Sequence, residues 1–244
     1  MTVGSRAGRR RALPRLGSAL ALCMAAGTAG AQLIAPVLVE LSAARRVVSV
    51  TLSNRGDRPM TFQAQALSWD QVDGTDRYAE SADLLVVPPV ANVAPGASQI
   101  FRVALRRQPP TEELAYRLIL EDVTADTAPR SGDGAAVRLQ FRHSLPVFVG
   151  TREKPQHGAR LVPCAATAPS PCVRLDNQGS QRVKVLKLAA AGAGWRREIA
   201  ASATVLTGRW KQWPFEAPAT AGALTVTAET TAGPLTLQLP QRTH

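Results

Sequence analysis

The sequence predicts an all-β protein built from two β-sandwich domains, and three observations lead to this prediction. Short runs rich in valine, leucine and threonine recur between turn signals, and apolar and polar residues alternate within several of them. After the first 31 residues, no segment carries a sustained helical repeat. A polar stretch at 151–158 interrupts the strand pattern and separates a longer first set of strands from a shorter second set.

Residues 1–31 have the features of a secretory signal peptide. Five arginines lie in the first 15 residues, an apolar run follows at 16–26, and small residues at 29–31 mark a cleavage site before Gln32. The apolar run is shorter than the roughly 18–20 residues that a bilayer-spanning helix needs, so a membrane anchor is the weaker alternative. The leader therefore predicts an exported protein.

The predicted first domain spans residues 32–150. A polar turn at 54–59 follows the first strong β run, and Asp73-Gly74 is a hairpin signal. The longest predicted strand, 137–149, has apolar residues on one face and polar residues on the other. The predicted strands are 47–52, 60–69, 84–87, 99–105, 116–123 and 137–149.

The predicted second domain spans residues 151–244 and is smaller. Once the leader is removed, Cys164 and Cys172 are the two cysteines that remain, and an even count in an exported chain predicts one disulfide closing a short loop. The alanine-rich stretch at 189–193 could form a short helix, although its glycines argue against a long one. The predicted strands are 173–175, 181–188, 203–206, 224–228 and 235–239.

Charge and composition exclude several function classes. The full chain has a net charge of +11, but the leader holds five arginines and no acidic residue, so 24 basic and 18 acidic residues remain, a net charge of +6. Much of the basicity therefore belongs to targeting, which argues against a nucleic-acid partner. The three histidines lie far apart and away from the cysteines, so the sequence predicts no metal site.

The sequence contains no motif for a nucleophile, a zinc protease or a phosphate-binding loop. Asp70, Asp73 and Asp76 lie three residues apart, whereas a calcium loop needs ligands at every second residue, so they are interpreted as hairpin-turn residues. Glu112, Glu113, Glu121 and Asp122 could be paired carboxylates of a glycosidase, but solvated strand ends explain them more simply. The chain is therefore not expected to be an enzyme or to carry a cofactor.

Several short motifs follow one another in a specific order between residues 33 and 150. They are Pro36–Leu41, Leu52–Asn54 with Pro59, Trp69–Gly74, Pro88-Pro89, Pro95-Gly96 with Gln99–Val103, Tyr116–Leu118 and Ser144–Val149. In this order the chain resembles the periplasmic chaperones of the chaperone–usher pilus pathway, the PapD-like proteins, especially their archaic and spore-coat-like branch. The resemblance is looser over 151–244, where 174–177 and 183–188 match best. It implies two immunoglobulin-like domains set at an angle, a periplasmic location, no cofactor and no catalysis.

The resemblance also implies a mechanism. A pilin is an incomplete sandwich, and such a chaperone lends it an edge strand through backbone hydrogen bonds, with alternate side chains filling the exposed groove. Val137, Leu139 and Phe141 are the candidate donor side chains. Burying each contributes about 1.5–3 kcal/mol before the ordering cost of association. The alternative, that they face the protein's own core, fits the alternation equally well.

The family further implies a pair of cations in the cleft between the domains, which anchor the pilin's C-terminal carboxylate. Here Leu38 stands in the place of the first of these cations and Pro146 in the place of the second. Arg102, Arg117 and Arg142 are the candidate substitutes, because arginine can bind a carboxylate with two hydrogen bonds. Each could instead be an ordinary salt-bridge residue on a strand face.

The predicted partners are pilin subunits and an outer-membrane usher, with possible self-association through the donor strand, and neither nucleic acid nor membrane insertion is expected. The main alternative is a secreted adhesin or carbohydrate-binding module. Such a module needs exposed aromatic residues on a concave face, and Trp195, Trp210 and Trp213 could serve.

Overall fold

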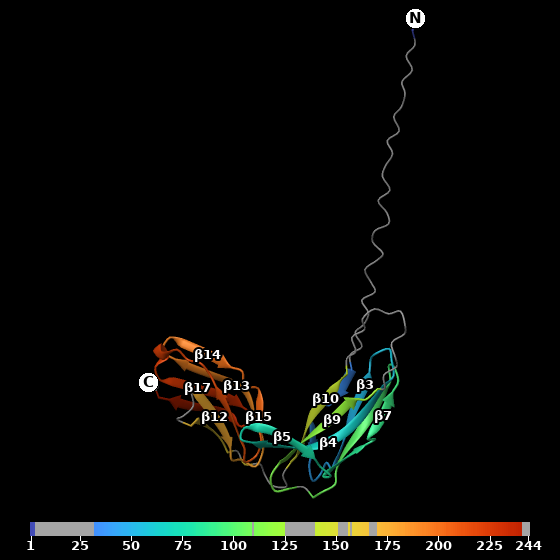
Figure 1. Cartoon of the computed structure of the whole chain (residues 1–244), viewed down its shortest axis with the longest axis horizontal. Coiled ribbons are helices and arrows are strands. Elements are labelled where there is room, and N and C mark those ends of the chain that lie inside the picture. The colour runs from blue at the N-terminus through green and yellow to red at the C-terminus, as the bar shows by residue number, and fades with distance from the viewer. Residues whose placement is uncertain are drawn as a thin grey trace.

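The computed structural model describes residues 1–2, 32–108, 110–124, 140–150, 156, 158–165 and 170–240. These residues form two β-sandwiches that lie like the arms of a V, with the β4–β5 hairpin at the point where the arms meet (Figure 1). The all-β prediction is confirmed, since the helical content of these ranges is one 3-10 turn, η1 (Ala219–Ala221). Within them, no helix is long and apolar enough to cross a membrane.

The N-terminal domain consists of two sheets that pack face to face. The four-stranded sheet has the order β1 (Gln32–Ala35), β3 (Val47–Asn54), β8 (Ser98–Leu105), β6 (Leu84–Val87). The six-stranded sheet has the order β2 (Val39–Leu41), β10 (Arg142–Val149), β9 (Leu114–Asp122), β4 (Met60–Val72), β5 (Thr75–Glu80), with β7 (Val90–Val93) also paired to β4.

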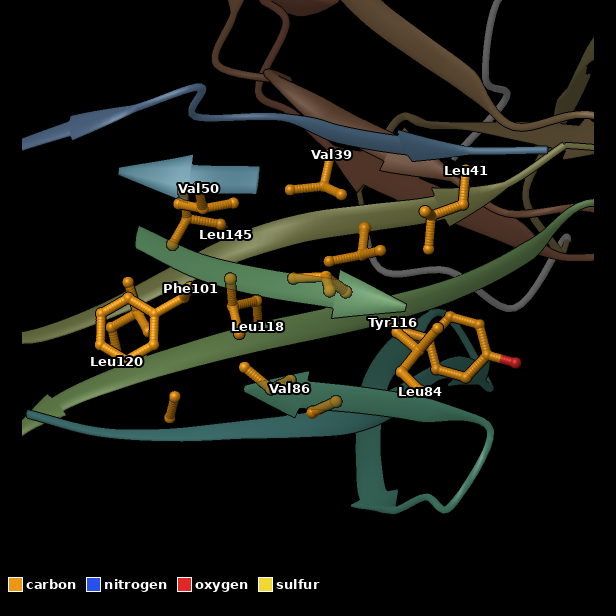
Figure 2. Close-up of a cluster of buried hydrophobic side chains, with 14 of the residues drawn as sticks. Val39, Leu41, Val50, Leu84, Val86, Phe101, Tyr116, Leu118, Leu120 and Leu145 are labelled. Carbon is orange, nitrogen blue, oxygen red and sulfur yellow. The ribbon is translucent and has the colours of Figure 1, made fainter. Parts of the chain in front are cut away.

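Alternation within these strands builds the core between the two sheets. From Phe101 onward every second residue of β8 is buried, and the buried residues of β9 include Leu118 and Leu120, so the two sheets meet through their apolar faces (Figure 2). Burying such a side chain contributes about 1.5–3 kcal/mol. The core is therefore the direct consequence of the period-two pattern in the sequence.

The β4–β5 hairpin turns where the sequence predicts. Val72 pairs with Thr75, and the two residues between them, Asp73 and Gly74, have positive φ of 50° and 73°. A two-residue turn with positive φ at both positions matches the twist of the flanking strands and favours an Asp-Gly pair. β4 continues for three residues beyond the predicted strand 60–69 and is the longest strand among the described residues.

The C-terminal domain also contains two sheets. The three-stranded sheet has the order β11 (Ala159–Pro163), β12 (Cys172–Asn177), β16 (Trp210–Pro214). The five-stranded sheet has the order β14 (Trp195–Ile199), β13 (Val183–Gly192), β17 (Leu224–Thr230), β18 (Gly233–Leu239), with β15 (Ala203–Val205) also paired to β13.

Two local predictions for this domain have different outcomes. The disulfide between Cys164 and Cys172 is present, so that prediction is confirmed. The alanine-rich stretch is not helical, because its residues 189–192 belong to β13. Small side chains suit this strand: the carbonyl oxygen of Ala221 lies so close to Gly192 that a Cβ there would be 2.4 Å from it. Tertiary packing therefore overrides the helical propensity of alanine.

Candidate functional site: the β10 edge and the interdomain junction

Strand β10, next to the edge strand β2, is paired unequally on its two sides. It pairs with β9 along its whole length, from Arg142 opposite Glu121 to Val149 opposite Leu114. On the other side β2 pairs only with Val147–Val149, in parallel. Within the described ranges, the first five residues of β10 therefore have a strand partner on one side only. Such an edge presents backbone N–H and C=O groups to an incoming strand.

Of the three predicted donor residues, Phe141 lies at the start of this edge. Val137 and Leu139 lie outside the described residues. Phe141 directly precedes β10 and is half-buried, and its carbonyl oxygen accepts a hydrogen bond of 2.8 Å from the backbone N–H of Asp122 on β9. Its ring stacks on that of His143, with 6.2 Å between the ring centroids. Pairing with β9 thus extends at least one residue before β10, toward the predicted donor positions.

His143 lies beside this edge in a partly apolar setting. Its Nε2 atom is 2.7 Å from Oε1 of Gln32 on β1, so the histidine links the two sheets of the sandwich. Burial lowers the pKa of His143 below its ordinary value, which favours the neutral ring at neutral pH. The edge is therefore uncharged where Phe141 and His143 stack.

The three candidate carboxylate-binding arginines do not converge. Arg102 is exposed on β8 and, because its neighbours Phe101 and Val103 face the core, it lies on the outer face of the four-stranded sheet. Arg142 is exposed at the start of β10 and forms an ion pair of 3.7 Å with Glu121. Arg102 thus lies on the opposite face of the sandwich from the six-stranded sheet, where Arg117 and Arg142 are found.

Arg117 has the most distinctive environment of the three. It lies on β9, half-buried, and its guanidinium carbon is 3.9 Å from the centroid of the Trp69 ring and 6.0 Å from that of Tyr78. Its Nε atom is buried without a hydrogen-bond partner. In the part of the chain that the structure describes, no carboxylate is within ion-pair distance of Arg117. Stacking on aromatic faces holds the guanidinium in place while leaving its charge unneutralised.

Arg117 lies in the same row of the sheet as Leu38 and Pro146, the two positions at which the resemblance to pilus chaperones implies cations. Pro146 on β10 is paired with Arg117, and because Val147 is paired with Val39, Leu38 lies at the level of Pro146 on the other side. The row therefore contains Leu38, Pro146 and Arg117 in that order. Since neighbouring strands are about 4.8 Å apart, the guanidinium-bearing residue of this row is one strand away from Pro146.

A partly buried ion-pair cluster joins the two domains beside this row. Arg182 lies directly before β13 and forms an ion pair with Glu113, the residue directly before β9. The Nη2 atom of Arg182 is also 2.6 Å from Oε1 of Glu40 on β2. Its guanidinium carbon also lies 3.7 Å from the centroid of the Phe148 ring. Burial raises the pKa of Glu113, although hydrogen bonds and the charge of Arg182 oppose that shift. This cluster fixes the C-terminal domain against β2, β9 and β10.

The β4–β5 hairpin makes the second set of interdomain contacts. Gln71 is almost fully buried, donates a hydrogen bond of 2.8 Å to the carbonyl oxygen of Thr204, and accepts one of 3.0 Å from the N–H of Leu206. At the tip, the Trp210 ring covers Gly74 so closely that a Cβ on Gly74 would lie 2.9 Å from it. The hairpin is therefore part of the junction as well as an edge of its own sheet.

The aspartates of this hairpin are not all turn residues, which corrects the sequence-based interpretation. Asp73 forms the turn, but Asp70 binds Arg209 through two hydrogen bonds of 2.7 and 3.0 Å, and Asp76 pairs with Lys211 at 3.0 Å. Both partners come from the C-terminal domain. No local pattern could reveal them, because Arg209 follows Asp70 by 139 positions.

The tryptophans considered for a carbohydrate site do not form one. Trp195 and Trp213 pack against the core of the C-terminal domain. Trp210 lies between Gly74 and Arg174, whose guanidinium carbon is 4.7 Å from the centroid of its ring. Their positions are those of core and junction residues.

Comparisons with solved structures find the same two-domain fold. One match is a chain of the complex between the chaperone CsuC and the tip adhesion subunit CsuE, from the archaic Csu pili of Acinetobacter baumannii, with a TM-score of 0.63 and 19% identity over 86% of this chain and 98% of the other. Another belongs to the complex of the Salmonella enterica SafA pilin with the SafB chaperone, with a TM-score of 0.62 and 14% identity over 86% and 97% of the two chains.

A third match is the CupB2 chaperone of Pseudomonas aeruginosa, with a TM-score of 0.55 and 17% identity over 86% of this chain and 100% of the other. Among curated protein sequences, none matches the chain significantly. The family described as "Pili and flagellar-assembly chaperone, PapD N-terminal domain" matches residues 33–154, which is half of the sequence and includes all the strands of the first sandwich except the first residue of β1. The chain therefore belongs to the PapD-like pilus-assembly chaperones, which are not enzymes.

Proposed function

We propose that this chaperone captures pilin subunits in the periplasm by donor-strand complementation and delivers them to an outer-membrane usher. The chain would add the segment 137–146 to an incomplete pilin sandwich, with Val137, Leu139 and Phe141 filling the pilin's groove. The leader at 1–31 supports export, and the family supports the client class. Solved relatives in complex with a tip adhesin or a pilin offer the same kind of partner.

The observation that carries this proposal is the unequal pairing of β10. Its first five residues pair with β9 on one side, while β2 reaches only the last three residues on the other. Backbone groups on that side are available to a guest strand, and main-chain hydrogen bonds would supply affinity while alternate side chains supply specificity. The same open edge supports self-association of the free chaperone as an alternative use.

Among the candidate arginines, Arg117 is proposed as the anchor of the client's C-terminal carboxylate. The other cations at the interdomain junction are neutralised by named carboxylates: Arg182 by Glu113 and Glu40, Arg209 by Asp70, and Lys211 by Asp76. A carboxylate arriving beside β10 would meet in Arg117 a fixed, unpaired guanidinium, which can bind it with two parallel hydrogen bonds.

Co-expression with a pilin subunit from the same organism tests the donor strand. Leu139→Asp and Phe141→Asp each place a charge in the proposed groove, so soluble chaperone–pilin complex should be lost while the chaperone itself remains folded. Ile100→Asp is the matched control, because Ile100 is exposed on the outer face of the four-stranded sheet. Unchanged pilin capture by the two donor variants would refute the strand assignment.

Arg117→Gln tests the anchor separately. Losing a charge-assisted pair of hydrogen bonds should weaken the purified complex by about 10- to 100-fold, measured as its dissociation constant. Arg102→Gln is the control, since it removes the same charge from the opposite face of the sandwich. Equal effects of the two variants would show that overall charge, rather than a specific anchor, is what matters.

A further inference from the structure

We propose that Lys211 of the C-terminal domain is a positioning residue that keeps Arg117 available to the client, by neutralising Asp76. This role rests on the proposed function of Arg117 as the carboxylate anchor. The C-terminal domain would then take part in subunit recognition through one ion pair, between Lys211 and Asp76 on the β4–β5 hairpin. Without Lys211, the carboxylate of Asp76 would compete with the C-terminal carboxylate of the pilin for Arg117.

The surroundings of Asp76 show how firmly it is held. Its Oδ1 atom accepts hydrogen bonds of 3.0 Å from the Lys211 ammonium group and 2.9 Å from the Gln71 side-chain amide. Its Oδ2 atom is 3.5 Å from the Tyr78 hydroxyl. The side chains of Lys211 and Asp76 are only 19% and 30% exposed, so solvent screens this pair less than a surface pair.

Asp76 stays ionised at neutral pH, so its charge has to be balanced. Burial by itself raises the pKa of Asp76, but the hydrogen bonds from Lys211 and Gln71 and the charge of Lys211 outweigh burial and lower the pKa below its ordinary value. Gln71 is neutral and Tyr78 carries no charge at this pH. Lys211 is therefore the group that neutralises Asp76.

The aromatic rings of Trp69 and Tyr78 lie between Asp76 and Arg117. The Tyr78 hydroxyl faces Asp76, and the centroid of its ring is 6.0 Å from the guanidinium carbon of Arg117. Burial raises the pKa of Tyr78, while the nearby charge of Arg117 opposes that shift and the charge of Asp76 reinforces it, so both charges act on this tyrosine. The two charged groups thus share one small environment.

Three other carboxylates of the junction are already occupied. Asp70 is bound by Arg209, and Glu113 and Glu40 are bound by Arg182. Without Lys211, Asp76 would lose its cation while staying tethered on the hairpin whose Trp69 and Tyr78 rings face Arg117. A tethered carboxylate competes at a high effective concentration, and its charge weakens the attraction of Arg117 for an incoming anion.

The experiment compares four full-length chaperones: wild type, Lys211→Met, Asp76→Asn/Lys211→Met and Arg117→Gln. Each is titrated with two forms of the pilin subunit, the native one and one lengthened by two C-terminal glycines. The two added glycines move the terminal carboxylate away from Arg117. The ratio of the two dissociation constants isolates the contribution of the carboxylate, and binding through the donor strand cancels from it.

We expect the wild type to prefer the native subunit by about tenfold or more, and Arg117→Gln to lose this preference. Lys211→Met should reduce the preference about fivefold, the scale of one partly exposed charge interaction. Replacing Asp76 as well should restore it, since the competing carboxylate is then gone. A merely structural role of Lys211 predicts the opposite, because the double variant would then stay as impaired as Lys211→Met.

The outcomes separate this inference from the proposed function. An unchanged preference in Lys211→Met, or a double variant that is not restored, overturns the role of Lys211 while leaving the anchor intact. If Arg117→Gln preferred the native pilin to the lengthened one as strongly as the wild type does, Arg117 would not be the anchor, and the role of Lys211 would fall with it. Thermal unfolding of each variant, measured alongside, establishes that the chaperones compared are folded.

Discussion

Asn54 in the N-terminal domain and Asn177 in the C-terminal domain hold corresponding turns in the same way. The Asn54 amide donates to the carbonyl oxygens of Arg58 at 2.7 Å and Val93 at 3.0 Å, and its Oδ1 accepts from the N–H of Gly56 at 3.0 Å. In each domain the asparagine ends a strand, and a glycine follows two residues later. The two sandwiches therefore share a turn that ties one sheet to the loop beside it.

Asn177 repeats this pattern with one more acceptor. Its amide donates to the carbonyl oxygens of Gln181, Val205 and Leu206 at 2.7, 3.1 and 3.2 Å, and its Oδ1 accepts from the N–H of Gly179 at 3.0 Å. Leu206 also contacts Trp69 and Phe148 of the first domain. The same turn that closes the C-terminal sandwich thus supports the junction, which Asn54 does not.

The two domains differ in what surrounds this shared turn. The first has a strand with unequal pairing and an unpaired arginine, whereas the second has a disulfide and supplies the cations that neutralise the first domain's carboxylates. The two sandwiches therefore share the asparagine turn, whereas the proposed donor strand and anchor belong to the first domain and the disulfide belongs to the second.

The largest effects are expected from removing the shared turn. Asn54→Ala and Asn177→Ala each leave buried carbonyl groups without partners, and each should lower the free energy of unfolding by about 3 kcal/mol. Asn177→Ala should cost at least as much as Asn54→Ala, because it leaves three carbonyl groups rather than two. Urea denaturation measures both losses.

Asn92→Ala is the control for these variants, since the Asn92 amide donates to the Thr61 hydroxyl at an exposed position and its loss should cost under about 0.5 kcal/mol. If both turn variants behaved like this control, the shared turn would not be what stabilises the two domains.

An intermediate effect is expected from the disulfide, and only in one domain. Cys164 and Cys172 are eight positions apart, so replacing both with alanine should cost roughly 2–3 kcal/mol by the chain-entropy relation. Hydrogen exchange should show weaker protection of Val185 in β13 but unchanged protection of Leu118 in β9. Equal loosening of both domains would mean that the junction couples their stabilities more tightly than their separate cores suggest.

The smallest effect is expected at the contact between the domains, and it depends on pH. The pKa of Asp76 is lowered in the folded state, so its ionised form contributes stability that is present above its ordinary value of 3.8 and is lost as the pH falls through the lower folded value. Asp76→Asn should therefore cost about 1 kcal/mol at pH 7 and almost nothing near pH 2.

Glu198→Gln provides the comparison within one domain, because Glu198 pairs with Lys187 at 2.9 Å but is largely exposed. Its effect on stability should be smaller than that of Asp76→Asn and should fade with added salt. An Asp76 variant whose stability difference did not change between pH 7 and pH 2 would contradict the ionic role of Asp76.

Local features of the sequence were sufficient to predict the fold class, the Asp73-Gly74 turn and the Cys164–Cys172 disulfide. These properties depend on alternation, on the conformational preferences of neighbouring residues and on cysteine count, all of which can be read within a short window. The order of the short motifs between residues 33 and 150 also predicted the family correctly. The short helix left open at 189–193 and the turn roles predicted for Asp70 and Asp76 were not found, and they concerned residues whose partners lie elsewhere in the chain.

Tertiary structure alone decided which charges meet. Arg102, Arg117 and Arg142 look alike in sequence, yet only Arg117 stacks on aromatic rings without a carboxylate partner in the described residues. Glu113 and Arg182 are 69 positions apart, and their pairing follows from how two separately folded sandwiches come together. An ion pair requires only that two groups meet in space, so no periodicity along the chain specifies it, whereas a strand leaves its alternation in every second residue.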